Sequence, residues 1–239
     1  MSDSSRLAAF LLLGTAVVTW GLYGIVRPSP PERMKVYSGP IGFLGRWAYW
    51  VSRPLLRAAA ALHLSANAIT AVGTLITVAA GGLAAVGEWA WAGFLLVFGS
   101  WCDLLDGEIA RSTQTQGKAG AFLDSNLDRL AEAALFFGLA AGFPDRRGLF
   151  AALVASLLVS YARARGEGLG VDCPAFGWER PHRLALVIFA LLVAPFLPAA
   201  RAVPTLELVS GAVAVGAGLT ALGRILVIRR ILLSRTEGR

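Results

Sequence analysis

Seven apolar stretches, each about as long as a bilayer is thick, restrict what this chain can fold into. A helix needs about 20 apolar residues to cross a hydrocarbon core of about 30 Å. Windows of that length run near residues 7–26, 67–87, 89–110, 120–142, 147–164, 183–200 and 206–228. Only 15% of the residues are charged, against about 25% in globular proteins. The sequence therefore predicts an all-α, polytopic membrane helix bundle and excludes a disordered chain or an ordinary soluble domain.

The first window, at residues 7–26, is either a membrane anchor or a signal peptide, and the residues after it help to decide between the two. Arg27-Pro28-Ser29-Pro30 is not a small-residue cleavage site. We interpret residues 1–30 as an N-terminal anchor span, with a signal peptide as the alternative. Residues 41–63 alternate arginines with aromatic and aliphatic residues, which is typical of a helix lying in the headgroup layer. The alternative for that segment is a short connector.

Basic residues predict the orientation of the bundle, since loops rich in Lys and Arg stay in the cytoplasm. With the N-terminus outside, 18 of the 22 basic residues fall on the cytoplasmic side, including a basic tail at 231–239. The formal charge of +7 therefore reports membrane topology, and no nucleic-acid partner is expected. The prediction is a multi-pass protein of the cell membrane.

Acidic residues gather where membrane helix is expected. Six of the fifteen fall within thirty residues, namely Asp103, Asp106, Glu108, Asp124, Asp128 and Glu132. A carboxylate in the bilayer costs about 2.5 kcal/mol or more, so such acids are functional by default. Spacings of three (103, 106) and four (124, 128) put each aspartate pair on one helical face. A short turn makes the two helices antiparallel neighbours, so the four aspartates are expected to converge near the inner leaflet.

Four clustered carboxylates repel one another unless they bind cations or protons. With no Cys or His in the cluster, Mg²⁺ or Mn²⁺ is favoured over zinc or copper. Two metals on four carboxylates suit phosphoryl transfer. Gly107, Ala110 and Gly120 leave room for a ligand beside the acids. Arg111 is placed to hold a phosphate oxygen.

These residues form the pattern DxxDGxxARx8GxxxDxxxD, which resembles the signature of the CDP-alcohol phosphatidyltransferases. The resemblance covers residues 39–230 and implies six core transmembrane helices plus the interfacial helix, with residues 1–30 as one extra N-terminal span. It implies transfer of a phosphatidyl group from CDP-diacylglycerol to an alcohol, with release of CMP, by a homodimeric membrane enzyme. The aspartates would bind two Mg²⁺ or Mn²⁺ ions, and Asp128 would also act as the base.

The same resemblance implies a nucleotide site. Gly107, Ala110 and Arg111 would cradle the cytidine diphosphate beside Gly120. Asn67 and Thr70 resemble family residues at the start of the first core span and would contact the nucleotide. A helix N-cap is the alternative for Ser65 or Asn67.

Residues 160–167 and 179–184 are similar to the corresponding stretches of bacterial phosphatidylinositol phosphate synthases. Arg163, Arg165, Arg180 and Arg183 would concentrate positive charge at the cytoplasmic mouth, and arginine grips phosphate well. An acceptor with its own phosphate is favoured, with inositol phosphate ahead of glycerol phosphate or another alcohol. The alternative is that these arginines only follow the positive-inside rule. Lys118 would either assist phosphate binding or anchor its loop.

A function of another class is an ion or proton transporter, whose buried acids would line a pathway. That function predicts acids spread along the membrane depth. The four aspartates are instead expected at one cytoplasmic end, beside small residues and an arginine, which favours the enzyme.

Overall fold

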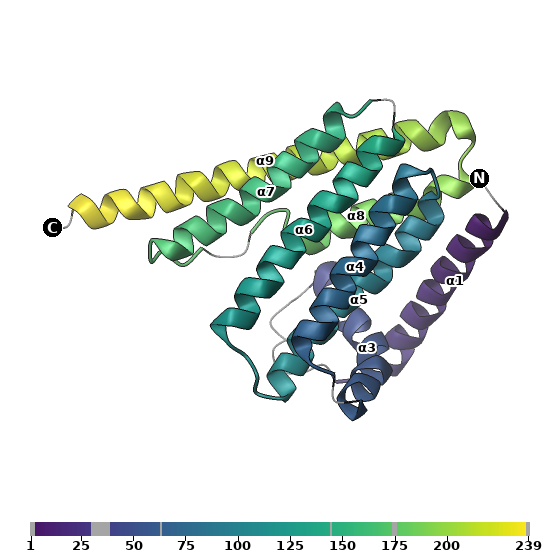
Figure 1. Cartoon of the computed structure of the whole chain (residues 1–239), viewed down its shortest axis with the longest axis horizontal. Coiled ribbons are helices and arrows are strands. Elements are labelled where there is room, and N and C mark those ends of the chain that lie inside the picture. Colours follow the sequence, from purple (N-terminus) through teal and green to yellow (C-terminus); the bar gives the residue numbers. More distant parts are fainter. Residues whose placement is uncertain (1–2, 30–38, 63, 144, 174–175, 238–239) are drawn as a thin grey trace.

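The computed structural model describes residues 3–29, 39–62, 64–143, 145–173 and 176–237. Within these residues the secondary structure is helical and contains no strand, so the all-α prediction is confirmed. The elements are α1 (Asp3–Val26), α3 (Gly39–Ala61), α4 (Ala66–Ala85), α5 (Trp89–Ser112), α6 (Lys118–Gly142), α7 (Arg147–Gly168), α8 (Arg180–Val193), the 3₁₀ turn η1 (Ala194–Phe196) and α9 (Ala199–Glu237). Figure 1 shows their arrangement.

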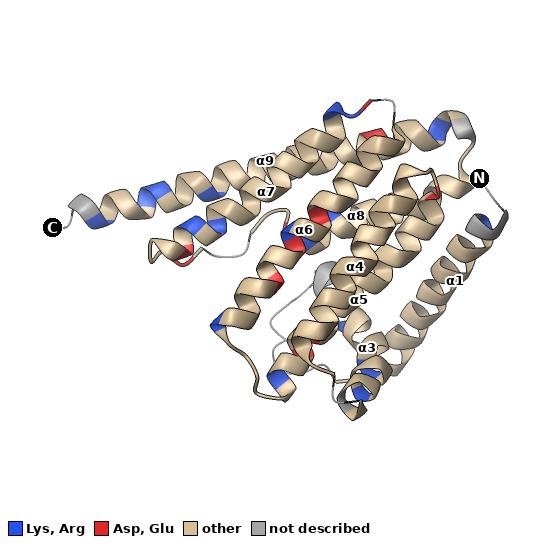
Figure 2. Ribbon diagram, in the orientation of Figure 1, with Lys and Arg blue, Asp and Glu red and all other residues tan. Residues whose placement is uncertain are grey.

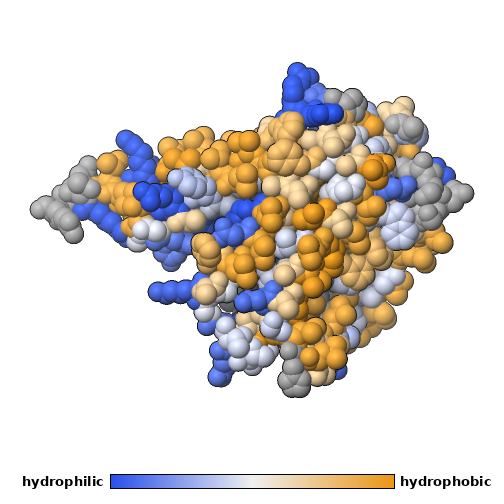
Figure 3. Space-filling model, viewed as in Figure 1, coloured by the Kyte–Doolittle hydropathy of each residue, from blue (hydrophilic) through white to orange (hydrophobic). Residues whose placement is uncertain are grey.

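Several helices are long and apolar enough to cross a bilayer. By length and composition they are Arg6–Val26, Ala66–Ala85, Arg147–Gly168 and Ala200–Arg235. Large apolar side chains are exposed on these helices, and Figure 3 shows apolar residues over most of the face in view. Soluble monomers rarely expose so much contiguous apolar surface. The chain is therefore a multi-pass membrane protein.

Two predicted boundaries differ from the structure, both because of proline. The window at 183–200 is one helix only to Val193, because Pro195 and Pro198 interrupt the backbone hydrogen bonding and a 3₁₀ turn follows. Pro204, which falls between the predicted windows at 183–200 and 206–228, instead lies in the second turn of α9. So close to a helix start it removes a single backbone hydrogen bond, and α9 continues without a break through the predicted tail to Glu237.

Helices α4, α5 and α6 pack at very short range because glycines line their contacts. A Cβ atom on Gly138 of α6 would collide with the backbone of Gly81 on α4. A Cβ atom on Gly73 of α4 would lie 2.6 Å from the Cβ of Cys102 on α5. Small residues allow membrane helices to approach closely. As a result, the start of α4, the end of α5 and the start of α6 meet at one end of the bundle (Figure 1).

The N-terminal helix α1 packs against this bundle along its length. Ala9 is fully buried and shares an apolar cluster with Ala90 of α5 and Leu192 of α8. At the other end of α1, the ring of Tyr23 lies 5.1 Å from that of Phe43 on α3. The expected interfacial segment is therefore helical, and it packs against α1.

Candidate active site

The acidic cluster lies where α5 and α6, two antiparallel helices that each pack against α4, approach each other; acidic residues are red in Figure 2. One carboxylate oxygen from each of Asp103, Asp124 and Asp128 lies within 4.8 Å of the other two. Asp103 comes from α5 and the other two come from α6, four residues apart on one face. The predicted convergence of these three aspartates is therefore present in the structure.

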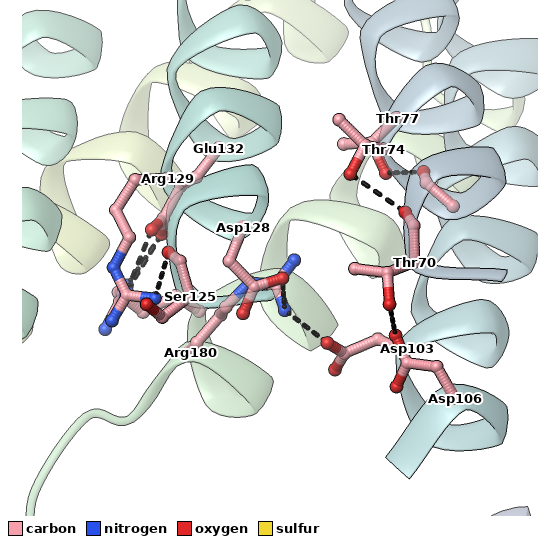
Figure 4. A network of polar contacts seen from close by, with 12 residues as sticks. Thr70, Thr74, Thr77, Asp103, Asp106, Ser125, Asp128, Arg129, Glu132 and Arg180 are labelled. Atoms are coloured by element: carbon pink, nitrogen blue, oxygen red, sulfur yellow. Dashed lines mark hydrogen bonds and ion pairs between the residues drawn. The ribbon is translucent and has the colours of Figure 1, made fainter. Parts of the chain in front are cut away.

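Asp106, the fourth aspartate, lies beside this group and is held by α4. The Thr70 hydroxyl donates a hydrogen bond of 2.6 Å to Oδ2 of Asp106, which is only 6% exposed (Figure 4). Asp106 and two of the clustered aspartates line one small polar pocket. The lining residues are Thr70, Gly73, Thr74, Thr77, Gly99, Asp103, Asp106, Asp128, Ala131 and Arg180.

Arg180, the first residue of α8, reaches into this pocket. Its Nη1 atom lies 2.9 Å from Oδ1 of Asp103 and 2.7 Å from Oδ1 of Asp128. One guanidinium nitrogen thus links α5 to α6 and offsets part of the charge repulsion between the two carboxylates. The sequence-based prediction assigned Arg180 to the acceptor, and the structure places it directly on the aspartates.

Arg183 lies in a different place from the one predicted. Its guanidinium donates to both carboxylate oxygens of Glu132, at 2.9 to 3.2 Å, and to the Trp178 carbonyl at 2.8 Å. The side chains of Arg183 and Glu132 are 1% and 2% exposed. Instead of standing free at the mouth, Arg183 forms a buried ion pair that ties α8 to α6, because an unpaired carboxylate at Glu132 would be too costly.

Three further residues predicted for the acceptor lie outside the aspartate pocket. Arg163 pairs with Glu167 at 2.8 Å on the exposed surface of α7. Arg165 lines a separate hollow between α7 and α9, and Lys118 is exposed at the start of α6. Of the five predicted acceptor residues, Arg180 is therefore the one that lines the pocket.

The predicted nucleotide residues border the acidic cluster. Arg111 pairs with Glu108 at 3.0 Å, and a Cβ atom on Gly107 would lie 3.2 Å from its Nη1 atom. A Cβ atom on Gly120 would lie 3.5 Å from Oδ1 of Asn67, so α4 and α6 also meet here. Ala110, which directly precedes Arg111 on α5, is half-buried.

The N-cap alternative is resolved in favour of Ser65. The Ser65 hydroxyl accepts a hydrogen bond of 3.2 Å from the Ala68 amide, and α4 begins at Ala66. Asn67 is therefore inside the helix and does not serve as its cap.

Sequence reasoning missed two kinds of residue. Thr74 and Thr77 continue the row begun by Thr70 on α4, and their hydroxyls bond to carbonyls of their own helix. The sequence does contain a signal for these threonines: spacings of four and three residues put them on one face of an apolar span. Arg224, one of the 18 basic residues on the predicted cytoplasmic side, is 1% exposed, pairs with Glu179 and donates a hydrogen bond of 2.9 Å to the Val159 carbonyl. An arginine inside a predicted span is itself a functional signal.

The donor set of the cluster fits a hard divalent cation. All candidate ligands are carboxylate oxygens, which Mg²⁺ and Mn²⁺ prefer. In addition, Oδ1 of Asp124 is buried and has no hydrogen-bond partner among the described residues. A bound cation would satisfy this buried acceptor oxygen.

Comparison with known proteins identifies the family. The sequence profile described as CDP-alcohol phosphatidyltransferase matches residues 63–223, more than half of the chain. An archaetidylinositol phosphate synthase of Pyrococcus horikoshii is 38% identical over 147 residues, covering 59% of this chain and 78% of the relative. A phosphatidylinositol phosphate synthase of Mycolicibacterium smegmatis is 34% identical over 189 residues, covering 75% and 84%.

Similarity to solved structures supports the same family. Crystal structures of Mycobacterium tuberculosis phosphatidylinositol phosphate synthase superimpose with a TM-score of 0.66 at 29% identity. The form with CDP-DAG bound covers 74% of this chain and 93% of its own, and the form with manganese and citrate covers 73% and 87%. Acidic pocket, sequence profile and fold lead to one conclusion: this chain is an enzyme of the CDP-alcohol phosphatidyltransferase family.

Proposed function

We propose that this enzyme transfers the phosphatidyl group of CDP-diacylglycerol to a hydroxyl of inositol phosphate and releases CMP. The observation that carries the proposal is the meeting of Asp103, Asp106, Asp128 and Arg180 in one pocket. The names of the relatives support inositol phosphate as the acceptor, and the CDP-DAG in the mycobacterial structure supports the donor.

In this mechanism Asp128 is the base. It accepts the proton of the acceptor hydroxyl, whose oxygen forms a bond to the phosphorus that carries diacylglycerol. The bond from that phosphorus to the CMP oxygen breaks, and CMP leaves with the electron pair. A base must reach the hydroxyl at hydrogen-bond distance. The position of Asp128 on the pocket wall, next to Arg180, is suited to this role.

We propose that Asp103, Asp106, Asp124 and Asp128 hold two Mg²⁺ or Mn²⁺ ions. When bound, the ions supply positive charge that offsets the charge developing on the phosphate and on the leaving CMP. Thr70 fixes the orientation of the Asp106 carboxylate through its hydrogen bond. The manganese in the mycobacterial structure supports this metal class.

The nucleotide would lie along the small residues that border the aspartates. Gly107 and Gly120 leave the backbone open, while Asn67 offers an amide beside Gly120. Ala110 also leaves room, Thr70 lies at the edge of this surface, and Arg111 would hold a phosphate oxygen.

For the acceptor, we propose that Arg180 contacts the inositol phosphate directly. It is the arginine that already reaches the aspartates. Lys118, which is exposed at the start of α6, would add positive charge around the same mouth, whereas Arg163 and Arg183 are neutralised by Glu167 and Glu132. The buried pair Arg183–Glu132 and the partly buried pair Arg224–Glu179 would position the first turn of α8, from which Arg180 projects.

We further propose that α4 to α9 supply six core spans, with α3 at the interface and α1 as an extra span. The domain boundaries would be 1–30, 39–230 and 231–239. The outside N-terminus predicted from the basic residues puts the site at the cytoplasmic face of the cell membrane. We also propose that the enzyme forms a homodimer.

The test is a detergent assay of CMP release with Mg²⁺ or Mn²⁺, CDP-diacylglycerol and one of four acceptors: inositol phosphate, glycerol phosphate, inositol or serine. We expect release above background with inositol phosphate and a lipid product that carries a second phosphate. Faster turnover with glycerol phosphate would replace the acceptor and keep the reaction. Absence of CMP release with all four would overturn the donor or the acceptor class.

A further inference from the structure

A second hollow lies between the last turns of α7 and α9, away from the aspartates. Its volume is about 410 Å³, and none of its lining residues belongs to the aspartate pocket. The lining consists of apolar residues and two arginines: Leu158, Tyr161, Ala162, Arg165, Gly166, Ile225, Ile228, Arg229, Leu232 and Leu233. Figure 1 shows α7 and α9 running together on one side of the bundle, where these turns lie.

The two helices are parallel and in register, which puts the arginines at one level. At one end Gly148 approaches Gly211, and a Cβ atom on it would lie 3.8 Å from the Gly211 amide. At the other end a Cβ atom on Gly166 would lie 2.7 Å from Cδ1 of Ile228. Arg165 directly precedes Gly166 and Arg229 directly follows Ile228. The two arginine side chains therefore start at the same level along the helix pair.

Neither of these guanidinium groups has an ion-pair or hydrogen-bond partner within the described residues. Two arginines near them in sequence are paired: Arg163, two residues before Arg165, binds Glu167, and Arg224, five residues before Arg229, binds Glu179. The hollow thus holds two unneutralised positive charges at the level of the predicted cytoplasmic surface.

The apolar lining decides what kind of anion fits. Leu158, Ile225 and Leu233 are 45%, 48% and 45% exposed, and they lie on two helices that are apolar enough to cross a membrane. A soluble anion would satisfy the arginines and leave this apolar surface uncovered. A lipid with an anionic headgroup satisfies both, because arginine pairs bind phosphate and acyl chains cover the leucines and isoleucines.

We propose that this hollow, which we call the α7/α9 site, binds one anionic phospholipid, with its headgroup between Arg165 and Arg229 and an acyl chain along the apolar lining. This assigns Arg165 to a lipid rather than to the acceptor. The site is independent of the proposed reaction, since it uses no residue of the aspartate pocket.

Native mass spectrometry of the full chain tests this proposal. The protein is released from nanodiscs that contain equal amounts of phosphatidylglycerol and phosphatidylcholine, and the lipids retained on each molecule are counted. The test variant is Arg165→Gln with Arg229→Gln. The matched control is Arg163→Gln with Arg230→Gln, which removes the same charge from the same two helices outside the hollow. Size-exclusion chromatography checks that both variants are folded.

We expect the wild type and the control to retain one phosphatidylglycerol in preference to phosphatidylcholine, and the test variant to retain it at least about fivefold less. Equal loss in both variants would overturn the proposal, because it would reflect general attraction to basic residues. Equal retention of the two lipids by the wild type would also overturn it. So would displacement of the lipid by millimolar inorganic phosphate, which would indicate a site for a soluble anion.

Discussion

The Nη1 atom of Arg180 lies 2.7 Å from Oδ1 of Asp128, and the same nitrogen reaches Asp103 at 2.9 Å. In the proposed function, Arg180 would compete with a metal cation for two carboxylate oxygens, and its charge would attract the acceptor phosphate. For Arg180→Gln we expect opposite effects on the two ligands. The Mn²⁺ concentration for half-maximal activity should fall, and kcat/KM for inositol phosphate should drop by about 10- to 100-fold, as for loss of a charged hydrogen bond worth about 1.5–3 kcal/mol.

Titrations of Mn²⁺ and of inositol phosphate measure these two effects. Arg147→Gln is the control, since Arg147 is exposed and pairs with Asp145 in the loop before α7. Unchanged values for both ligands in Arg180→Gln would contradict a role for Arg180 at the site.

Asp128→Asn keeps the size of the side chain and removes its ability to accept a proton. We expect CMP release to fall by at least about 100-fold, the usual contribution of a general base. Thermal unfolding in detergent should stay cooperative. Asp145→Asn, at an exposed carboxylate, is the control. Full turnover by Asp128→Asn would remove Asp128 as the base.

Thr70→Val removes the hydroxyl that holds Asp106 and keeps the shape of the side chain. Loss of a residue that orients a metal ligand typically lowers metal affinity by about 10- to 100-fold. We expect a higher Mn²⁺ requirement with a smaller change in the maximal rate. Thr15→Val is the control, since the Thr15 hydroxyl also bonds to a carbonyl of its own helix but lies on α1. An unchanged Mn²⁺ requirement would mean that the hydrogen bond is incidental.

The buried pair of Glu132 and Arg183 should matter more for stability than the exposed pair of Arg163 and Glu167. Removal of one partner from a buried pair costs about 3–5 kcal/mol, because the other charge stays buried. An exposed pair is worth about 0–1 kcal/mol. We expect Glu132→Gln to lower the Tm in detergent clearly and Glu167→Gln to leave it nearly unchanged. Similar Tm values for the two variants would contradict the burial of the first pair.

Gly138 and Gly82 form a matched pair for testing the contact between α4 and α6. A Cβ atom on Gly138 would collide with the Gly81 backbone, whereas one on Gly82 would meet open space. We expect Gly138→Ala to lower both the Tm and the activity. Gly82→Ala should be neutral or stabilising by up to about 1 kcal/mol, since alanine favours helix. Tolerance of Gly138→Ala would mean that the helices are farther apart than described.

The parts of this molecule that were predictable from sequence depend on short-range patterns. Apolar length marked the helices, and spacings of three and four residues together with a short turn brought Asp103, Asp124 and Asp128 together. Pairings between distant residues were not predictable. Arg180 and Arg183 are three residues apart on α8, yet one reaches Asp103 and the other Glu132. Which acid each one meets depends on the rotation and depth of α8 against two other helices, which no local pattern specifies.

Proline effects were also hard to predict, because they depend on position within a helix. Pro195 contributes to the end of a helix, whereas Pro204 is accommodated near the start of one. The residues alone do not show where a helix begins.

Helix α9 is much longer than the hydrocarbon core of the membrane is thick. Its 39 residues extend about 58 Å at a rise of about 1.5 Å each, nearly twice the thickness of the hydrocarbon core. To fit inside that core the helix would have to tilt by about 60°, beyond the roughly 40° at which membrane helices are found. With the C-terminus on the cytoplasmic side, as we propose, the turns around Arg230 and Arg235 would extend beyond the membrane into the cytosol. In that orientation, soluble molecules approaching from the cytosol would meet these positively charged turns before they meet the membrane surface.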